Sequence, residues 1–161
     1  LLNGKNPTIE VMPKQSAFNV IPEIDLFQDN GYTREEMKMV WETQKIFEDE
    51  NLMINPTTVR VPVFYGHSDS LHLETRDAVT VAEVRQLLGV APGVTVIDDH
   101  TPGGYPTAVT EAAKQDGVFG GRIREDISCD RGINLWIVSD NVRKGAALNS
   151  IQISEALFDR M

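Results

Sequence analysis

Apolar and polar positions repeat with two different periods along the chain, and this pattern predicts both strands and helices. Residues 59–65 form an apolar run that ends at Gly66, and an alternating stretch follows at residues 67–74. A period of two is typical of a strand with one covered face. Because glycine adopts backbone angles that other residues avoid, the pattern predicts two strands that meet at a kink.

Two stretches carry apolar residues at helical spacing behind a capping signal. Thr33 and Glu36 have the spacing of a capping box, in which the hydroxyl accepts a backbone N–H and the glutamate reaches back. The helix that follows carries an apolar stripe made of Met37, Val40, Trp41 and Phe47. Thr80 and Gly89 bound a second, shorter amphipathic helix.

The remaining apolar segments predict the rest of a sheet. Residues 133–138 form a continuous apolar run, which is typical of a strand covered on both faces and so requires a covering layer from another subunit or domain. Short strands are predicted at 94–97 and at 117–126, the latter with a glycine bulge at its start. Residues 139–141 cap a closing helix. The fold class is therefore α+β, a mixed, largely antiparallel sheet with helices packed on one face.

Length and charge narrow the class of protein. With 161 residues the chain is about one domain, long enough to bury a core. A formal charge of −9 argues against nucleic acid and anionic membranes as partners, and no apolar run approaches the roughly 20 residues of a membrane span. The first residues contain neither an initiator methionine nor a signal peptide. We therefore expect a portion of a longer, cytoplasmic chain.

Cysteine and histidine positions give no metal site. Cys129 is the single cysteine and lies between Asp126 and Asp130, whose carboxylates disfavour a reactive thiolate, so we expect a structural role. His100 follows two aspartates in a loop rich in glycine and proline. These residues lack the fixed geometry that a metal requires, and we interpret them as a solvated loop with no bound metal.

Four residues are candidates for chemistry. His67 directly follows the predicted kink, and Arg60 lies seven residues earlier inside the apolar run, where an arginine normally needs an anionic partner. A cation and a titratable ring favour a site for an acidic substrate, although a solvated histidine explains the pattern too. Glu42 and Lys45 lie three residues apart on one flank of the first helix. An ordinary surface ion pair is the alternative for these two.

Taken together, these segments resemble the C-terminal half of the aspartate-semialdehyde dehydrogenase family. The resemblance covers nearly all of the chain and rests on five blocks in order: AFNVIPEID (17–25), GYTREEMKMVWETQKI (31–46), VRVPVFYGHS (59–68), GRIRED (121–126) and WIVSDNVRKGAALNSIQI (136–153).

The resemblance implies a role for each candidate residue. The family's glutamate that binds the substrate amino group falls on Glu42, and its phosphate-binding lysine falls on Lys45. Its substrate-binding arginine falls on Arg60, and its general acid/base histidine falls on His67. The cofactor-contacting polar residue of its VSDN block falls on Asn141.

The resemblance also implies an activity and its partners. Members interconvert L-aspartyl 4-phosphate and L-aspartate 4-semialdehyde with NADP(H) and inorganic phosphate, in the biosynthesis of lysine, diaminopimelate, threonine and methionine. Residues 1–161 would be the substrate-binding and dimerisation domain, with the fold of the glyceraldehyde-3-phosphate dehydrogenase C-terminal domain. NADP would be bound mainly by an N-terminal domain that also carries the nucleophilic cysteine, so this part alone should be inactive. The expected assembly is a homodimer, with a tetramer as the alternative.

Two other functions remain open. A non-catalytic paralogue or stand-alone dimerisation module would keep the fold and lose the catalytic positions, whereas all four candidates are present here. A sister reductase would act on an acyl phosphate whose amino group is acetylated. Such a substrate has no positive charge for Glu42 to bind.

The two central candidates impose a geometric condition. On a regular strand, residues seven apart lie on opposite faces and about 23 Å apart at roughly 3.3 Å per residue. Arg60 and His67 can meet one small substrate only if the chain bends between them. We predict bends at Pro62 and Gly66.

Overall fold

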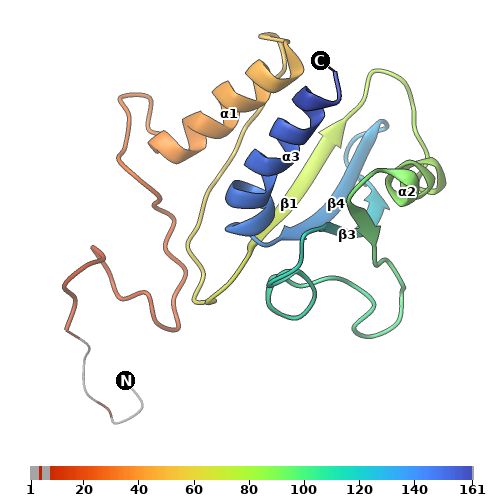
Figure 1. Cartoon of the computed structure of the whole chain (residues 1–161). Coiled ribbons are helices and arrows are strands. Elements are labelled where there is room, and N and C mark those ends of the chain that lie inside the picture. The colour runs from red at the N-terminus through yellow and green to blue at the C-terminus, as the bar shows by residue number, and fades with distance from the viewer. Residues whose placement is uncertain (1–3, 5–7, 161) are drawn as a thin grey trace. The chain divides into compact units, whose positions relative to one another are not determined.

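The computed structural model describes Gly4 and residues 8–160, which divide into two structural units. The first unit extends to Pro62, and the second begins at Val63. Figure 1 traces both units along the chain. Among the described residues, no helix is both long enough and apolar enough to cross a bilayer.

The first unit contains helix α1 (Arg34–Phe47), and its start is fixed by the predicted capping box. The Glu36 N–H donates to Thr33 Oγ1 at 3.3 Å, and the Thr33 N–H donates to Glu36 Oε2 at 2.7 Å. The helix ends where Glu48 adopts a left-handed conformation, with φ of 53°. The capping prediction is confirmed.

Glu36 also anchors the segment that returns after the helix. Its second oxygen accepts the Thr58 N–H at 2.8 Å, so one buried carboxylate holds two distant backbone segments. The backbone N–H groups of Thr33 and Thr58 lower the pKa of the Glu36 carboxyl, because hydrogen bonds to the charged form favour it.

The predicted strand over residues 59–65 is wrong. Within this run, Arg60 makes an isolated bridge with Ile21, and the chain bends at Pro62, Phe64 and Tyr65. Alternating valines there expose between 43% and 47% of their surface: Val59, Val61 and Val63. An apolar run forms a ladder only when a partner strand offers its backbone groups, and apolar character alone does not supply one.

The second unit is built on a four-stranded sheet in the order β1-β4-β3-β2. Its strands are β1 (His67–Glu74), β2 (Val94–Val96), β3 (Val118–Glu125) and β4 (Gly132–Ser139). The β1–β4 and β3–β4 pairs are antiparallel, and the β2–β3 pair is parallel. The sheet is mixed and largely antiparallel, as the sequence predicts.

Both faces of strand β4 pack in part against other elements of this chain. Ile133 and Leu135 point to one face and pack in a cluster with residues of α2 (Val81–Val90), which Figure 1 shows on the β2 and β3 side of the sheet. Val138 points to the other face and packs against the short π-helical segment η1 (Ala108–Ala112). Trp136 on the same strand is only half-buried, so the expected cover by another subunit or domain stays a prediction.

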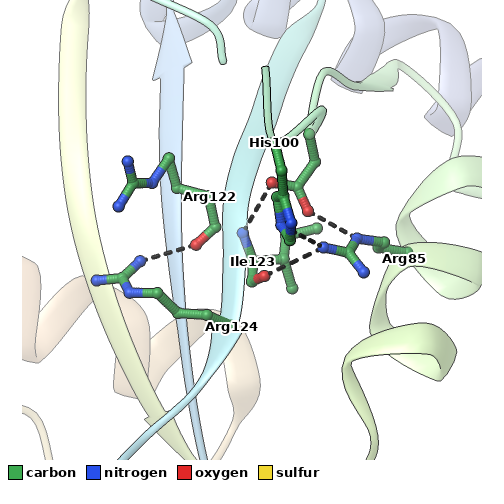
Figure 2. A network of polar contacts seen from close by, with 6 residues as sticks. Arg85, His100, Arg122, Ile123 and Arg124 are labelled. Atoms are coloured by element: carbon green, nitrogen blue, oxygen red, sulfur yellow. Dashed lines mark hydrogen bonds and ion pairs between the residues drawn. The ribbon is translucent and has the colours of Figure 1, made fainter. Parts of the chain in front are cut away.

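A bulge in β3 is held by a buried ion pair (Figure 2). The register with β4 shifts between Gly121 and Arg124, which places the bulge after the glycines and not at the strand's start. The Ile123 N–H there donates to Asp98 Oδ1 at 3.2 Å. Arg85 on α2 donates its Nε–H to Asp98 Oδ2 at 2.7 Å and approaches the Ile123 carbonyl at 3.4 Å.

The loop around His100 is more structured than the sequence predicts. Asp98 exposes only 4% of its side chain, and His100 Nε2 lies 3.5 Å from an Arg85 guanidinium nitrogen. Because of the bulge, the Ile123 N–H has no backbone acceptor in β4, and the Asp98 carboxylate accepts it instead. This explains why an acidic residue follows strand β2.

The chain closes with a π-helical segment, η2 (Arg143–Ala147), that continues into helix α3 (Leu148–Phe158). No residue of α3 is buried among the described residues. Four of its apolar side chains expose more than half of their surface: Ile151, Ile153, Leu157 and Phe158.

We predict that Asp98→Ala destabilises the second unit by about 2 to 3 kcal/mol, because it leaves the Arg85 guanidinium and a buried N–H without their acceptor. Urea unfolding measures the change. Asp116→Ala is the matched control, since it breaks an exposed ion pair with Arg143 and should cost less than about 1 kcal/mol. Equal effects of the two substitutions would contradict this account of the bulge.

Candidate active-site residues

His67 is the first residue of β1, and its position is set by the glycine before it. Gly66 has a φ of +83°, a conformation that side chains disfavour. A Cβ added there would lie 2.9 Å from Ala108 Cβ and 3.1 Å from the Ser139 carbonyl oxygen. Only glycine fits this corner, so the predicted kink at Gly66 is present and the exposed imidazole of His67 begins the strand.

Asn141 lies at the same corner, although it is distant in sequence. His67 pairs with Ser139 at the end of β4, and Asn141 follows two residues later. The Gly66 N–H donates to Asn141 Oδ1 at 3.2 Å, across 75 residues of chain. The structure therefore brings together His67 and Asn141, two of the five residues selected from the sequence.

A buried carboxylate fixes the turn that carries Asn141. Asp140 accepts the N–H groups of Val142 at 2.9 Å and Arg143 at 3.0 Å, and its second oxygen accepts the Lys114 N–H at 2.7 Å. These backbone donors, Arg143 foremost, lower the pKa of the Asp140 carboxyl. Asp140 thus bonds the turn that precedes the closing segment, whereas the N-cap residue of that segment is Val142 and makes no side-chain capping bond.

Asp69 is a further group beside His67 that the sequence analysis did not select. It lies two residues along β1 and so points to the same face as His67. Burial raises the pKa of the Asp69 carboxyl, and the charge of His67 acts in the opposite direction. The alternation of the HSDS segment carries this signal, because it places both titratable groups on one face.

Glu42 and Lys45 lie on α1 in the first unit, and both side chains are exposed. The ion pair found on this helix joins Lys38 to Glu35 at 3.0 Å. Among the described residues Glu42 and Lys45 form no such pair, so the surface ion pair considered as an alternative is absent. Both charges remain accessible to a ligand.

Arg60 is held by its backbone and not by its side chain. Its N–H donates to the Ile21 carbonyl at 2.8 Å, and its carbonyl accepts the Ile21 N–H at 3.0 Å. The side chain is exposed and makes no ion pair within the described part of the chain. The predicted strand around Arg60 is therefore wrong, and an anionic substrate as the partner of this side chain stays a prediction.

The bends predicted between Arg60 and His67 are present at Pro62 and Gly66, so no unbroken strand joins the two residues. The described residues contain no cluster of three or more histidine, cysteine or acidic groups able to hold a metal. Cys129 is a half-buried free thiol.

Comparison with known proteins identifies the family. The family model of the semialdehyde dehydrogenase dimerisation domain matches residues 1–144. The chain belongs to this family. The chain is 59% identical over 98% of its length to an aspartate-semialdehyde dehydrogenase of Legionella pneumophila, and it spans 45% of that relative.

Solved structures agree with this assignment. The structure of aspartate semialdehyde dehydrogenase II complexed with ASA from Vibrio cholerae matches with a TM-score of 0.92 and 52% identity, over 98% of the dimerisation domain and 46% of that chain. The enzyme with NADP from Candida albicans matches with a TM-score of 0.68 and 27% identity, over 87% and 44%. The dimerisation domain thus spans about half the length of the proteins it matches.

Asp140→Asn in the dimerisation domain should lower the free energy of unfolding at neutral pH and flatten its dependence on acid pH. Asparagine keeps one oxygen acceptor, but its NH2 group would face the Lys114 N–H. In the native protein, ionised Asp140 contributes stability fully above its usual pKa, near 3.8, and this contribution is lost as the pH falls through the lowered pKa of the folded state.

Urea unfolding between about pH 2 and pH 7 measures this difference, with Asp116→Asn as an exposed control. Identical pH dependence in Asp140→Asn and the native protein would contradict the assignment.

Proposed function

We propose that this chain is the substrate-side half of an aspartate-semialdehyde dehydrogenase. The enzyme would interconvert L-aspartyl 4-phosphate and L-aspartate 4-semialdehyde with NADP(H) and phosphate, in the cytoplasmic biosynthesis of lysine, threonine and methionine. The observation that carries this proposal is the high identity to enzymes of that name along almost the entire chain. The domain would form a homodimer, in keeping with its family.

His67 would act as the general acid/base. An imidazole changes charge near neutral pH, so it can take a proton from a thiol and return it to the intermediate. Its exposed position at the first residue of β1 leaves the ring accessible to a substrate. The glycine corner behind it supports this role, because a fixed backbone limits where the ring can lie.

Glu42 and Arg60 would recognise the two ends of the amino-acid group. The Arg60 guanidinium offers a planar pair of donors that matches a carboxylate in bidentate geometry. Glu42 supplies a negative charge for the substrate ammonium. The exposure of both side chains, and the absence of an ion pair to either within the described part of the chain, support these roles.

Lys45 would hold the phosphate as a point charge, and Asn141 would contact the nicotinamide end of NADP. NADP supplies or takes the hydride. The Asn141 oxygen already accepts the Gly66 N–H, so its NH2 group is left to donate to an oxygen such as that of a carboxamide. Within the described residues, no turn with G-x-G-x-x-G spacing joins a strand to a helix. The remainder of NADP and the nucleophilic cysteine would therefore belong to the other half of the enzyme.

A non-catalytic paralogue with the same fold is the alternative. The presence of Glu42, Lys45, Arg60 and His67 together favours the enzyme. A sister reductase for an acetylated acyl phosphate is disfavoured, because an acetylated amine has no charge for Glu42 to bind.

The intact gene product should reduce NADP when given aspartate semialdehyde, and only with inorganic phosphate. His67→Gln should lower kcat by about 10²- to 10⁴-fold, the usual contribution of a positioned acid/base. His100→Gln is the control, because that ring contacts Arg85 and should leave the rate within about threefold. No turnover by the folded, full-length protein would favour the paralogue, and a loss under tenfold in His67→Gln would remove that residue from the role.

Lys45→Ala should raise the concentration of phosphate needed for half-maximal rate, with a smaller effect on the KM for the aldehyde, because it removes a charge that holds phosphate in ground and transition states alike. Steady-state rates over a phosphate series measure this. Lys38→Ala is the matched control on the same helix, since that lysine pairs with Glu35. An unchanged phosphate dependence in Lys45→Ala contradicts the assignment.

A further inference from the structure

We infer that Asn141 is a positioning residue for His67, in addition to any contact it makes with the cofactor. The inference rests on the proposed function, since it assigns a second role at the same corner of the sheet. It starts from the backbone of Gly66, which directly precedes the imidazole in sequence and sets the direction in which β1 begins.

The Gly66 N–H lies beyond the last backbone pair of the β1–β4 ladder. That ladder ends where His67 pairs with Ser139, because β4 stops there and the chain turns into η2. The Asn141 side chain accepts this strand-end N–H at 3.2 Å, where a main-chain carbonyl of β4 would have continued the ladder. The carboxamide thus extends the ladder by one step in place of a main-chain carbonyl.

The acceptor is itself held in place. The buried Asp140 carboxylate accepts three backbone N–H groups, two in the turn that carries Asn141 and one from Lys114. On its other side, Gly66 is enclosed by Ala108 and by the Ser139 carbonyl. One continuous set of contacts therefore links the turn to Asn141, Asn141 to Gly66, and Gly66 to the ring that transfers the proton.

This geometry also separates the two ends of the Asn141 side chain. Because the Gly66 N–H is a donor, the atom facing it is the oxygen, and the NH2 group points elsewhere. Positioning uses the oxygen, whereas a cofactor contact uses the NH2 group. Substitutions that remove one function and keep the other can tell the two roles apart.

The test uses the full-length enzyme with Asn141→Ala, which removes both groups, and Asn141→Asp, which keeps an oxygen acceptor. Asn141→Ala should lower kcat at saturating NADP by about five- to a hundredfold, because displacing a catalytic group by a fraction of an ångström to one ångström has effects of this order. The KM for NADP should rise in both variants, because both lose the NH2 group proposed to contact the cofactor. The KM therefore reports the cofactor contact, and kcat at saturating NADP reports the positioning role. Asn51→Ala is the control, since its carboxamide binds Asp49 in its own turn.

Asn141→Asp should recover most of the lost kcat, at a higher pH optimum, because an added carboxylate favours the charged form of a nearby imidazole. Rates over a pH series measure this. If Asn141→Asp is as slow as Asn141→Ala at every pH, or if Asn141→Ala changes only the KM for NADP, the positioning role is overturned. Asn141→Ser provides a second variant without the acceptor if alanine prevents folding.

A measurement without substrate or cofactor makes the test independent of the proposed reaction. The His67 imidazole resonances, assigned by their loss in His67→Gln, should shift in Asn141→Ala and stay unchanged in Asn51→Ala. An unchanged His67 signal overturns the inference even if the enzyme is active. Absence of wild-type turnover with aspartate semialdehyde overturns the proposed function, and the resonance shift still decides the positioning role.

Discussion

Pairing and burial of strand β4 is the constraint on which the second unit depends. It is the only strand hydrogen-bonded along its length to two antiparallel neighbours within the described part of the chain. Its side chains alternate between the cluster with α2 and the cluster with η1, which fixes its register, since a slip of one residue would exchange the two faces. The positions of β1 and β3 follow from this single strand.

The polar residues of this unit lie where that regular pairing fails. A bulge in β3 leaves the Ile123 N–H without a ladder partner, and Asp98 accepts it. The end of β4 leaves the Gly66 N–H beyond the ladder, and Asn141 accepts it. Side-chain oxygens therefore complete the sheet at its irregular points, and one of these points is the residue that precedes the candidate acid/base.

Local sequence signals predict the parts of the fold that depend on local interactions. The capping box of Thr33 and Glu36 and the helix start at Thr80 are both present, because each threonine and the glutamate that bonds it lie three residues apart. The apolar run of β4 is a strand, and residues of α2 and η1 pack against its buried positions. The run over 59–65 has equal apolar character and is not a strand, since β structure also requires a partner that local pattern does not specify.

In the candidate site, too, the features set by neighbouring residues were predictable from the sequence, and those that depend on tertiary contacts were not. Spacing places Glu42 and Lys45 on one helix flank, and a glycine before His67 predicts the kink, because both are properties of neighbouring residues. The bond between Gly66 and Asn141 spans 75 residues, and it depends on where β4 ends and how Asp140 folds the next turn. Both the end of β4 and the turn around Asp140 are set by tertiary contacts, which the local sequence does not specify. The position of a catalytic side chain can therefore depend on a residue to which the sequence gives a different role. Asn141 can serve both roles, because one carboxamide has an oxygen that accepts from the backbone and an NH2 group that donates to a ligand.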